Sequence, residues 1–244
     1  ERPEWIKPLF IVKAIRYPGN SVHSTDYLDA EDFSGTLPRI FEGSLAFIMR
    51  NLRKVQSGQG VNAPGLPEIP PSVFEELLVN ALVHRDYLVN ASIRLFIFDD
   101  RIEIISPGHL PNNLTVEKIR SGISNIRNPI LVSYAAKGLL PYRGLGSGIK
   151  RALAEWPEIS FTDDRDGSMF IATVRRKGLD DMESAEKGSQ KSSQKSSQKI
   201  IELMRNDPKI TVANLALHIG IRESDQEADW KIESTRSHPA HWSG

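Results

Sequence analysis

Three glycines in the second half of the chain have the spacing of a loop that could bind an anion. Gly144, Gly146 and Gly148 form G-x-G-x-G directly before an expected helix. Glycines there let backbone N–H groups approach an anion closely, and the N-terminus of the next helix adds partial positive charge. That charge contributes only about 0.3–1 kcal/mol, so a nucleotide would need further ligands. A flexible turn is the alternative interpretation, because such glycine motifs are weak signals.

A row of polar side chains on an earlier segment could line a pocket. Glu76, Asn80 and His84 recur every fourth residue and therefore share one face of a helix. Valines flank the row, whereas a solvated face would more often carry Lys and Glu. The pattern suggests a partly enclosed pocket, although short motifs of this kind often have a purely structural explanation. The alternative is a helix buried on two sides whose polar groups are satisfied locally.

The helix that must position this row is predicted at residues 72–88. Its apolar side chains follow the i, i+3, i+4, i+7 spacing of an amphipathic helix. Pro70 and Pro71 end the preceding chain, and Ser72 offers a hydroxyl N-cap. Glu75 lies three residues after Ser72, as a capping box requires. The pattern therefore predicts a helix that begins at Ser72.

The remaining patterns predict a domain of α+β type. Strands are expected at residues 9–17, 92–98 and 101–106, with a closing hairpin at 159–162 and 168–175. Further helices are expected at 42–55, 114–120, 128–137 and 149–156. Asn128 is the expected N-cap of the third of these, with Pro129 at its first position. Residues 32–37 read as a loop.

Composition changes divide the chain into four parts. Residues 1–56 hold too few elements for a core of their own and are expected to lean on the neighbouring domain, at 57–178. Residues 179–199 are a Ser/Gln/Lys-rich stretch that predicts a flexible linker. Residues 200–244 open with two short expected helices, typical of a helix-turn-helix.

Overall composition excludes several classes of function. The 244 residues hold 31 basic and 31 acidic side chains, so net charge gives no global attraction to nucleic acid or membrane. The absence of cysteine excludes disulfides, thiol nucleophiles and Cys-ligated zinc. No apolar run reaches the roughly 18 residues of a membrane span. We expect a soluble, cytoplasmic protein, and a start at Glu1 rather than Met suits a fragment of a longer chain.

The order of the motifs resembles a known family. A helix with E-x-x-x-N-A-x-x-H precedes a strand ending in S-P-G and a later G-x-G-x-G; the matching runs are NALVHRDY, RIEIISPGHLP, RNP and GLGSGI. Together they resemble the GHKL-type ATP-binding module of RecG-like, Schlafen/AlbA-associated bacterial and archaeal regulators, over most of residues 5–176. The resemblance implies a GHKL-like two-layer α/β sandwich. It also implies a Schlafen/AlbA-like or connecting segment at 1–56 and a winged helix-turn-helix after the linker.

The resemblance implies a role for each matching residue. Glu76 would orient or deprotonate the attacking water as a general base. Asn80 would bind Mg²⁺ through its amide oxygen, and the magnesium would bridge the phosphates of ATP. The three loop glycines would hold those phosphates. Arg127 lies in the segment 124–128, where such modules have a mobile lid, and could either reach phosphate or serve a surface or capping role.

One position departs from the family pattern. The aspartate that reads adenine in D-x-G-x-G is matched here by Ser106, in the triplet that ends at Gly108, and both residues are expected to bind the cofactor. A serine hydroxyl lacks the charge that the exocyclic amine of adenine favours. This departure leaves adenine specificity and ATP turnover open. His84 fits the family pattern, with a structural hydrogen bond as its expected role.

The C-terminal part departs further. A recognition helix should present Arg, Lys, Asn or Gln to base edges. Instead, residues 222–229 carry four acids and one arginine. We therefore expect a helix-turn-helix that is truncated or altered after Ile221.

The leading hypothesis is an ATP-binding, DNA-binding transcriptional regulator with Mg-ATP between the 72–88 helix and the 144–148 loop. It would be at most a weak ATPase. Helicase activity is not expected, because no G-x-x-x-x-G-K-[ST] P-loop occurs. The alternative is a non-hydrolysing DNA- or protein-binding module with a degenerate nucleotide pocket, which Ser106 favours. A third option is a homo-oligomeric scaffold that buries the face bearing Glu76.

Overall fold

The computed structural model describes residues 3–22, 25–55, 65–141, 146–178 and 205. The chain divides into two compact units, Glu1–Leu179 and Asp180–Gly244. All of the helices and strands described below belong to the first unit. The predicted linker at 179–199 and the predicted helix-turn-helix at 200–244 lie outside the described residues, apart from residue 205.

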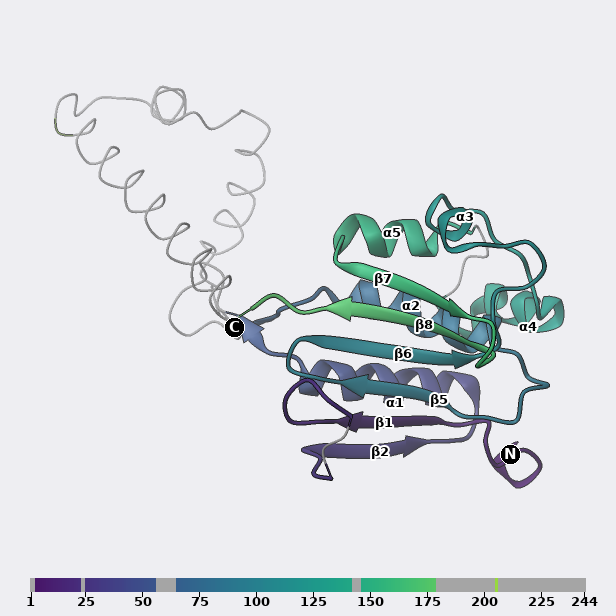
Figure 1. The fold of residues 1–244 in the computed structure, drawn as a ribbon, viewed down its shortest axis with the longest axis horizontal. Helices are drawn as coiled ribbons and strands as arrows, with labels where there is room; N and C mark the ends of the chain where they lie inside the picture. Colours follow the sequence, from purple (N-terminus) through teal and green to yellow (C-terminus); the bar gives the residue numbers. More distant parts are fainter. Residues whose placement is uncertain (1–2, 23–24, 56–64, 142–145, 179–204, 206–244) are drawn as a thin grey trace, which may run out of the picture. The chain divides into compact units, whose positions relative to one another are not determined.

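A six-stranded sheet forms one layer of the first unit (Figure 1). Its strands are β1 (Val12–Arg16), β2 (Asp29–Phe33), β5 (Ile93–Ile97), β6 (Arg101–Pro107), β7 (Ile159–Asp164) and β8 (Met169–Arg175). They lie in the order β2-β1-β5-β6-β8-β7. Strands β1 and β5 pair in parallel, and the other neighbours pair antiparallel.

Helices form the second layer. Figure 1 shows α1 (Leu37–Asn51) and α2 (Pro71–His84) together on one face of the sheet, and α5 (Gly148–Glu155) packs beside α2. The shorter elements are η1 (Pro3–Trp5), β3 (Lys54–Val55), β4 (Leu66–Pro67), α3 (Val116–Arg120), α4 (Pro129–Tyr134) and η2 (Ala135–Leu139). The first unit is therefore a mixed α+β structure of two layers; the residue patterns predict its class, and the resemblance implies the layers.

Alternation along the central strands fixes which face meets the helices. On β5, Ile93, Leu95 and Ile97 are buried, whereas Arg94 and Phe96 lie on the other face and are half-buried. Burying an aliphatic side chain of this size stabilises the fold by about 1.5–3 kcal/mol. A register slip by one residue would exchange the two faces. The pattern thus holds the sheet against α2, the helix that carries the polar row.

Helix α2 begins one residue earlier than predicted, and its capping differs. Pro71 occupies the first turn and Pro70 is the N-cap, without a side-chain cap. Pro is favoured at the first helical position, so Ser72 falls inside the helix, too late to cap it. The hydroxyl of Ser72 instead donates to Glu155 on α5. The helix ends at His84, before the predicted end at residue 88, because Arg85 has a non-helical backbone (φ −48°, ψ 144°).

Strand β2 corrects the expectation of a loop across residues 32–37, because its last two residues, Asp32 and Phe33, are paired with β1. The segment lacks β-branched residues, so local propensity does not reveal it. On its exposed surface, Arg50 of α1 donates to Asp29 at 2.8 Å and to Glu31 at 2.7 Å. Pairing with β1 and these contacts stabilise the strand.

Residues 1–56 share their core with the residues that follow. Their strands belong to the same sheet through the parallel pairing of β1 and β5. Phe47 and Ile48 of α1 are fully buried in the common core. The segment therefore leans on its neighbour, as its short length predicts. Its likeness to a Schlafen/AlbA-type domain stays a prediction.

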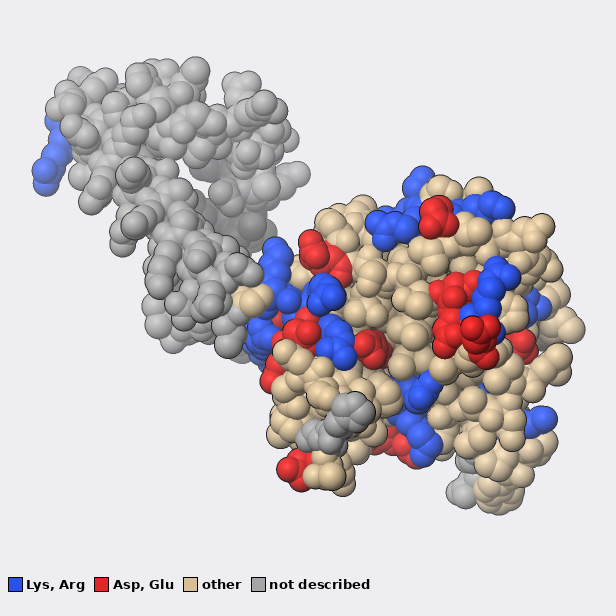
Figure 2. Space-filling view, viewed as in Figure 1, with Lys and Arg blue, Asp and Glu red and all other residues tan. Residues whose placement is uncertain are grey.

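The surface of the first unit carries both signs of charge. Figure 2 shows Lys and Arg interspersed with Asp and Glu over the side of the sheet that faces away from α1 and α2. Among the helices of the described residues, none is long and apolar enough to cross a membrane.

Candidate functional site

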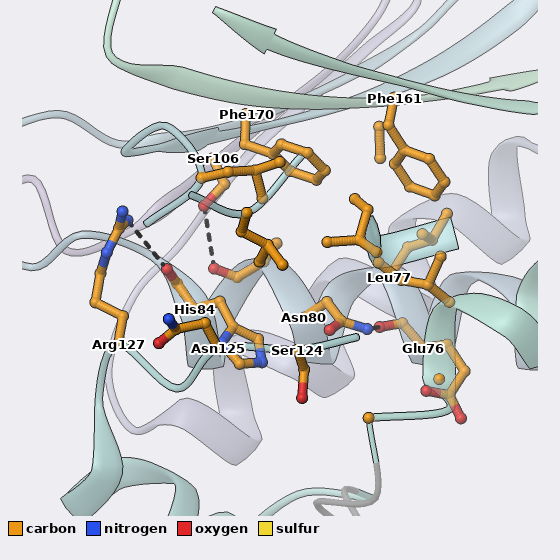
Figure 3. Close-up of a pocket in the computed structure, with 18 of the residues that line it drawn as sticks. Glu76, Leu77, Asn80, His84, Ser106, Ser124, Asn125, Arg127, Phe161 and Phe170 are labelled. Atoms are coloured by element: carbon orange, nitrogen blue, oxygen red, sulfur yellow. Dashed lines mark hydrogen bonds between the residues drawn. The ribbon is translucent and has the colours of Figure 1, made fainter. Parts of the chain in front are cut away.

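A cavity of about 100 Å³ lies beside the polar row of α2 (Figure 3). Its walls come from α2, the end of β6, the segment 108–127, the turn at 146–148, the start of α5 and the strands β7 and β8. The predicted site residues among its lining are Glu76, Asn80, Ser106, Gly108, Arg127, Gly146 and Gly148. Gly144 lies outside the described residues. Predicted site residues separated by up to 72 positions are thus brought to one cavity.

The amide of Asn80 has a defined orientation. Its Nδ2 donates to the backbone carbonyl oxygen of Glu76 at 2.7 Å. The amide oxygen lies on the opposite side of the same planar group, so it is turned away from that carbonyl. Asn80 is half-buried at the cavity wall. This orientation leaves an oxygen suited to a hard cation.

Glu76 is held in an ion pair with Arg151 of α5. The Nε of Arg151 lies 2.9 Å from Oε1 of Glu76, and a second guanidinium nitrogen donates to the same oxygen. Nη1 of Arg151 also donates to the hydroxyl of Ser147 at 3.1 Å. The Glu76 side chain is 17% exposed and the Arg151 side chain 46% exposed. The pair therefore lies at the cavity mouth, in contact with solvent.

Arg151 is a cavity residue that the sequence interpretation overlooks. It follows Gly148 by three residues, which places it one helical turn beyond the glycine motif. This three-residue spacing is the sequence signal that identifies Arg151 as a candidate. A residue one turn into the helix can face the same ligand as the loop before it.

Gly148 allows α5 to approach α2 closely. A Cβ at this position would lie 2.2 Å from Oε2 of Glu76 and 3.4 Å from Nδ2 of Asn80. Gly146 has a positive φ of 68°, and a Cβ there would lie 2.9 Å from the hydroxyl oxygen of Ser124. In this conformation the glycine turn therefore closes against protein side chains.

Ser106 is buried at the end of β6 and points toward α2. Its hydroxyl donates to the backbone carbonyl of Ala81 at 3.1 Å, as the dashed line in Figure 3 marks. A hydroxyl has one proton and two lone pairs. Because the proton is directed at Ala81, the oxygen can act only as an acceptor toward a ligand.

Arg127 connects two parts of the cavity wall. Its Nη1 lies 3.4 Å from the carbonyl oxygen of His84, and its Nη2 donates to the carbonyl of His109. Gly108 has a φ of 100°, and a Cβ there would lie 2.2 Å from Nη1 of Arg127. Arg127 therefore ties the end of α2 to the loop after β6, and Gly108 makes room for it.

Asn128 corrects the expected cap of the following helix. It occupies the N-cap position of α4, but its side chain makes no cap hydrogen bond. Its amide donates instead to the carbonyls of Val83 and Arg85, at 2.9 and 2.8 Å. These two carbonyls lie at the C-terminal end of α2 and just beyond it, where backbone oxygens lack partners within the helix.

An apolar slot adjoins Ser106. Phe161 of β7 and Phe170 of β8 stack with their ring centroids 5.8 Å apart and an interplanar angle of 14° (Figure 3). Ile104 and Ala172 complete this part of the lining. An apolar wall with one fixed polar atom is the usual environment for a flat, mostly apolar ligand group.

His84 is neutral near pH 7. Burial lowers the pKa of its imidazole below the ordinary value, and the nearby positive charge of Arg127 lowers it further. A neutral imidazole adds no charge to this side of the cavity.

The described residues contain no cluster of three or more His, Cys, Asp or Glu side chains that could hold a metal ion. Magnesium commonly takes one or two protein oxygens and completes its shell with phosphate oxygens and water. The orientated amide oxygen of Asn80 is suited to be one of these protein oxygens.

Comparison with known proteins agrees with part of the family expectation. Residues 90–165 match the family model described as "Putative ATP-dependent DNA helicase recG C-terminal". This part of the chain is similar to a RecG C-terminal-like ATPase domain. The match includes Ser106, Gly108, Arg127 and the glycine turn, and it begins after α2. Among curated proteins, none matches the chain.

The crystal structure of the DIP2311 protein from Corynebacterium diphtheriae has a similar fold. The TM-score is 0.53 at 19% sequence identity, and the similarity covers 95% of this chain and 47% of that one. This chain therefore spans about half the length of that protein. At this level of identity, the similarity concerns the fold alone.

Proposed function

We propose that this chain binds ATP with Mg²⁺ in the cavity beside α2, as part of a DNA-binding transcriptional regulator related to RecG-like proteins. One observation carries the proposal: the predicted base, metal and phosphate residues that the structure describes line one cavity. The similarity of residues 90–165 to a RecG C-terminal-like ATPase domain supports it.

The adenine would occupy the apolar slot. The stacked rings of Phe161 and Phe170 and the side chain of Ile104 offer the apolar contacts that a base requires. The oxygen of Ser106 would accept a hydrogen bond from the exocyclic amine, since its own proton is directed at Ala81. Serine would thus perform the acceptor part of the family aspartate without its charge.

The phosphates would lie near the 146–148 turn. Backbone N–H groups of glycine can approach phosphate oxygens closely. Asn80 would supply one oxygen to the magnesium, which supplies positive charge to the phosphates when bound. Glu76 would be the general base for a slow hydrolysis, once its carboxylate is no longer paired with Arg151.

The volume of the present cavity is smaller than a nucleotide requires. Ligand pockets usually enclose about 300–1,000 Å³, whereas this cavity encloses about 100 Å³. ATP binding would therefore have to widen it. The small volume also favours the alternative function, a DNA- or protein-binding module whose nucleotide pocket is degenerate and does not hydrolyse ATP.

The DNA-binding part of the proposal rests on the sequence. The pattern at residues 200–219 predicts the start of a helix-turn-helix, and the family description for residues 90–165 names a DNA helicase. We propose that nucleotide state biases DNA binding. Strand unwinding is not proposed, because the sequence has no P-loop.

Two titrations test this function. Calorimetric titration of Mg-ATP and Mg-GTP into the full chain should give saturable binding of ATP and weaker binding of GTP, whose carbonyl cannot donate to Ser106. Fluorescence anisotropy of labelled duplex DNA should then change when ATP is added. Absence of ATP binding at millimolar concentration would favour the degenerate-pocket alternative, and DNA binding unaffected by ATP would remove the regulatory part.

A further inference from the structure

We propose that Arg151 is the cavity residue that binds the polyphosphate of the ligand, and that Glu76 is an internal anion which competes for it. The inference rests on the proposed function and identifies the group that recognises phosphate in that site. In the absence of ligand, the Glu76 carboxylate occupies the guanidinium through two donor nitrogens, Nε and Nη2. A phosphate would have to replace it.

The choice of Arg151 follows from the two arginines of the cavity lining that the structure describes. Arg127 donates to the carbonyls of His84 and His109 and lies against Gly108. Turning it toward a ligand would leave two carbonyls without their donor. Arg151 is 46% exposed and its partner is a carboxylate. A phosphate can therefore replace that partner with the same two-nitrogen geometry.

The energies favour such an exchange. A carboxylate and a guanidinium in contact with solvent stabilise each other only weakly. A polyphosphate carries more negative charge than one carboxylate and also accepts two parallel hydrogen bonds from arginine. A Cβ on residue 148 would lie 2.2 Å from Oε2 of Glu76. Because Gly148 has no Cβ, the carboxylate of Glu76 can lie beside the turn that is proposed to bind phosphate. The internal carboxylate thus lies where phosphate is expected.

The exchange would also give Glu76 a conditional role. While paired with Arg151, its Oε1 accepts hydrogen bonds from the guanidinium and is a poor acceptor for a water proton. Once phosphate holds Arg151, Oε1 no longer accepts from the guanidinium and becomes available to a water. Binding of the polyphosphate would thus free Glu76 from Arg151 to act as the general base.

The test is a double-mutant cycle at Glu76 and Arg151 of the full chain. Binding of Mg-ATP and of Mg-tripolyphosphate is measured by calorimetry for the wild type, Glu76→Gln, Arg151→Gln and the double variant. We expect Glu76→Gln to bind both probes about two- to fivefold more tightly, the worth of a partly exposed ion pair. Arg151→Gln should bind both about tenfold more weakly, the worth of charge-assisted hydrogen bonds.

The double variant separates competition from simple repulsion. If Glu76 competes for Arg151, the gain from Glu76→Gln should fall to less than about twofold once Arg151 is absent. An equal gain in both backgrounds would overturn the inference, because charge repulsion between Glu76 and phosphate needs no arginine. Thermal unfolding of each variant checks that the fold is retained.

Matched controls lie next to each position. Glu75→Gln and Lys150→Gln each remove one charge from the neighbouring residue, and neither residue lines the cavity. Their effects on both probes should stay below about twofold, as expected for screened surface charges. Effects as large as those at Glu76 and Arg151 would contradict the inference.

The two probes distinguish this inference from the proposed function. Tripolyphosphate binding with the expected cycle but without ATP binding would reject the nucleotide proposal and keep the phosphate role of Arg151. ATP binding without coupling between Glu76 and Arg151 would keep the nucleotide proposal and reject the inference. Binding of neither probe to any of the four proteins would reject both.

Discussion

The hydroxyl of Ser106 lies 3.1 Å from the backbone carbonyl oxygen of Ala81, to which it donates its proton. Strand β6 is thereby tied to α2 inside the cavity. Because the hydroxyl proton is used in this bond, Ser106 can only accept hydrogen bonds from a ligand, through its lone pairs. Ser106 can therefore accept a hydrogen bond from an amine group of a ligand, as the proposed adenine contact requires.

Removing this hydroxyl should weaken ATP binding selectively. We expect Ser106→Ala to raise the Kd for Mg-ATP about three- to tenfold, the worth of a neutral hydrogen bond, and to leave the Kd for Mg-tripolyphosphate unchanged. Calorimetry measures both. Ser133→Ala is the matched control, because Ser133 also donates to a backbone carbonyl but lies outside the cavity lining. Equal losses for both probes would contradict base recognition by Ser106.

A side chain at position 108 should destabilise the fold. Gly108→Ala would bring a Cβ to 2.2 Å from Nη1 of Arg127 and 2.5 Å from Cβ of Asp86, at a φ of 100°. We expect a loss of about 2–4 kcal/mol in the free energy of unfolding, measured with urea. Gly138 has the same φ with nothing within 4 Å of its Cβ position, so Gly138→Ala isolates the backbone strain. Equal losses in the two variants would show that the close approach to Arg127 and Asp86 is unimportant.

The neutral imidazole of His84 should make the fold sensitive to acid. Burial and Arg127 lower its folded-state pKa below the ordinary value of 6.5. Below pH 6.5 the unfolded chain therefore binds a proton that the folded chain does not, and stability falls as pH falls toward the folded pKa. The slope is at most about 1.4 kcal/mol per pH unit.

Replacing the imidazole tests this dependence. In urea unfolding between pH 7.5 and 5.5, His84→Gln should lose less stability below pH 6.5 than the wild type, because glutamine does not titrate. The difference between the two curves isolates His84 from the other histidines. Parallel curves would refute the assignment.

The buried pair Glu68–Arg176 should be essential for stability. Their side chains are 2% and 1% exposed, and Nε of Arg176 lies 2.9 Å from Oε1 of Glu68. Glu68→Gln would leave a buried guanidinium without its counter-charge, at a cost of about 3–5 kcal/mol in the free energy of unfolding. In the exposed pair Lys13–Asp32, Asp32→Asn should cost less than about 1 kcal/mol. Chemical denaturation of both variants measures the contrast.

Features that depend on neighbours in sequence were predictable. The four-residue spacing of Glu76, Asn80 and His84 fixes one helical face, and alternation along β5 fixes its buried side. The resemblance also implied roles for eight residues, and the seven of them that the structure describes line one cavity. Their chemical roles stay predictions.

Features that depend on distant contacts were not predictable. Strand β2 has an unfavourable composition and forms because β1 and Arg50 hold it. The parallel pairing of β1 with β5 joins segments about 80 residues apart. The Glu76–Arg151 pair spans 75 positions, and no local pattern links the two. Pro70, Pro71 and Ser72 each indicate a helix start in the sequence, and α2 begins at Pro71 rather than at Ser72.

Magnesium-dependent ATP binding at Asn80 is the central claim, and one calorimetric experiment addresses it. Mg-ATP and metal-free ATP are titrated into the wild type, Asn80→Ala and Asn51→Ala. Asn51 is the matched control, because its amide also donates to the carbonyl four residues earlier in its helix, yet it lies outside the cavity. We predict binding that magnesium strengthens about tenfold or more in the wild type and in Asn51→Ala, and that Asn80→Ala loses this strengthening. Absence of ATP binding at millimolar concentration, or equal magnesium dependence in all three proteins, would contradict the account.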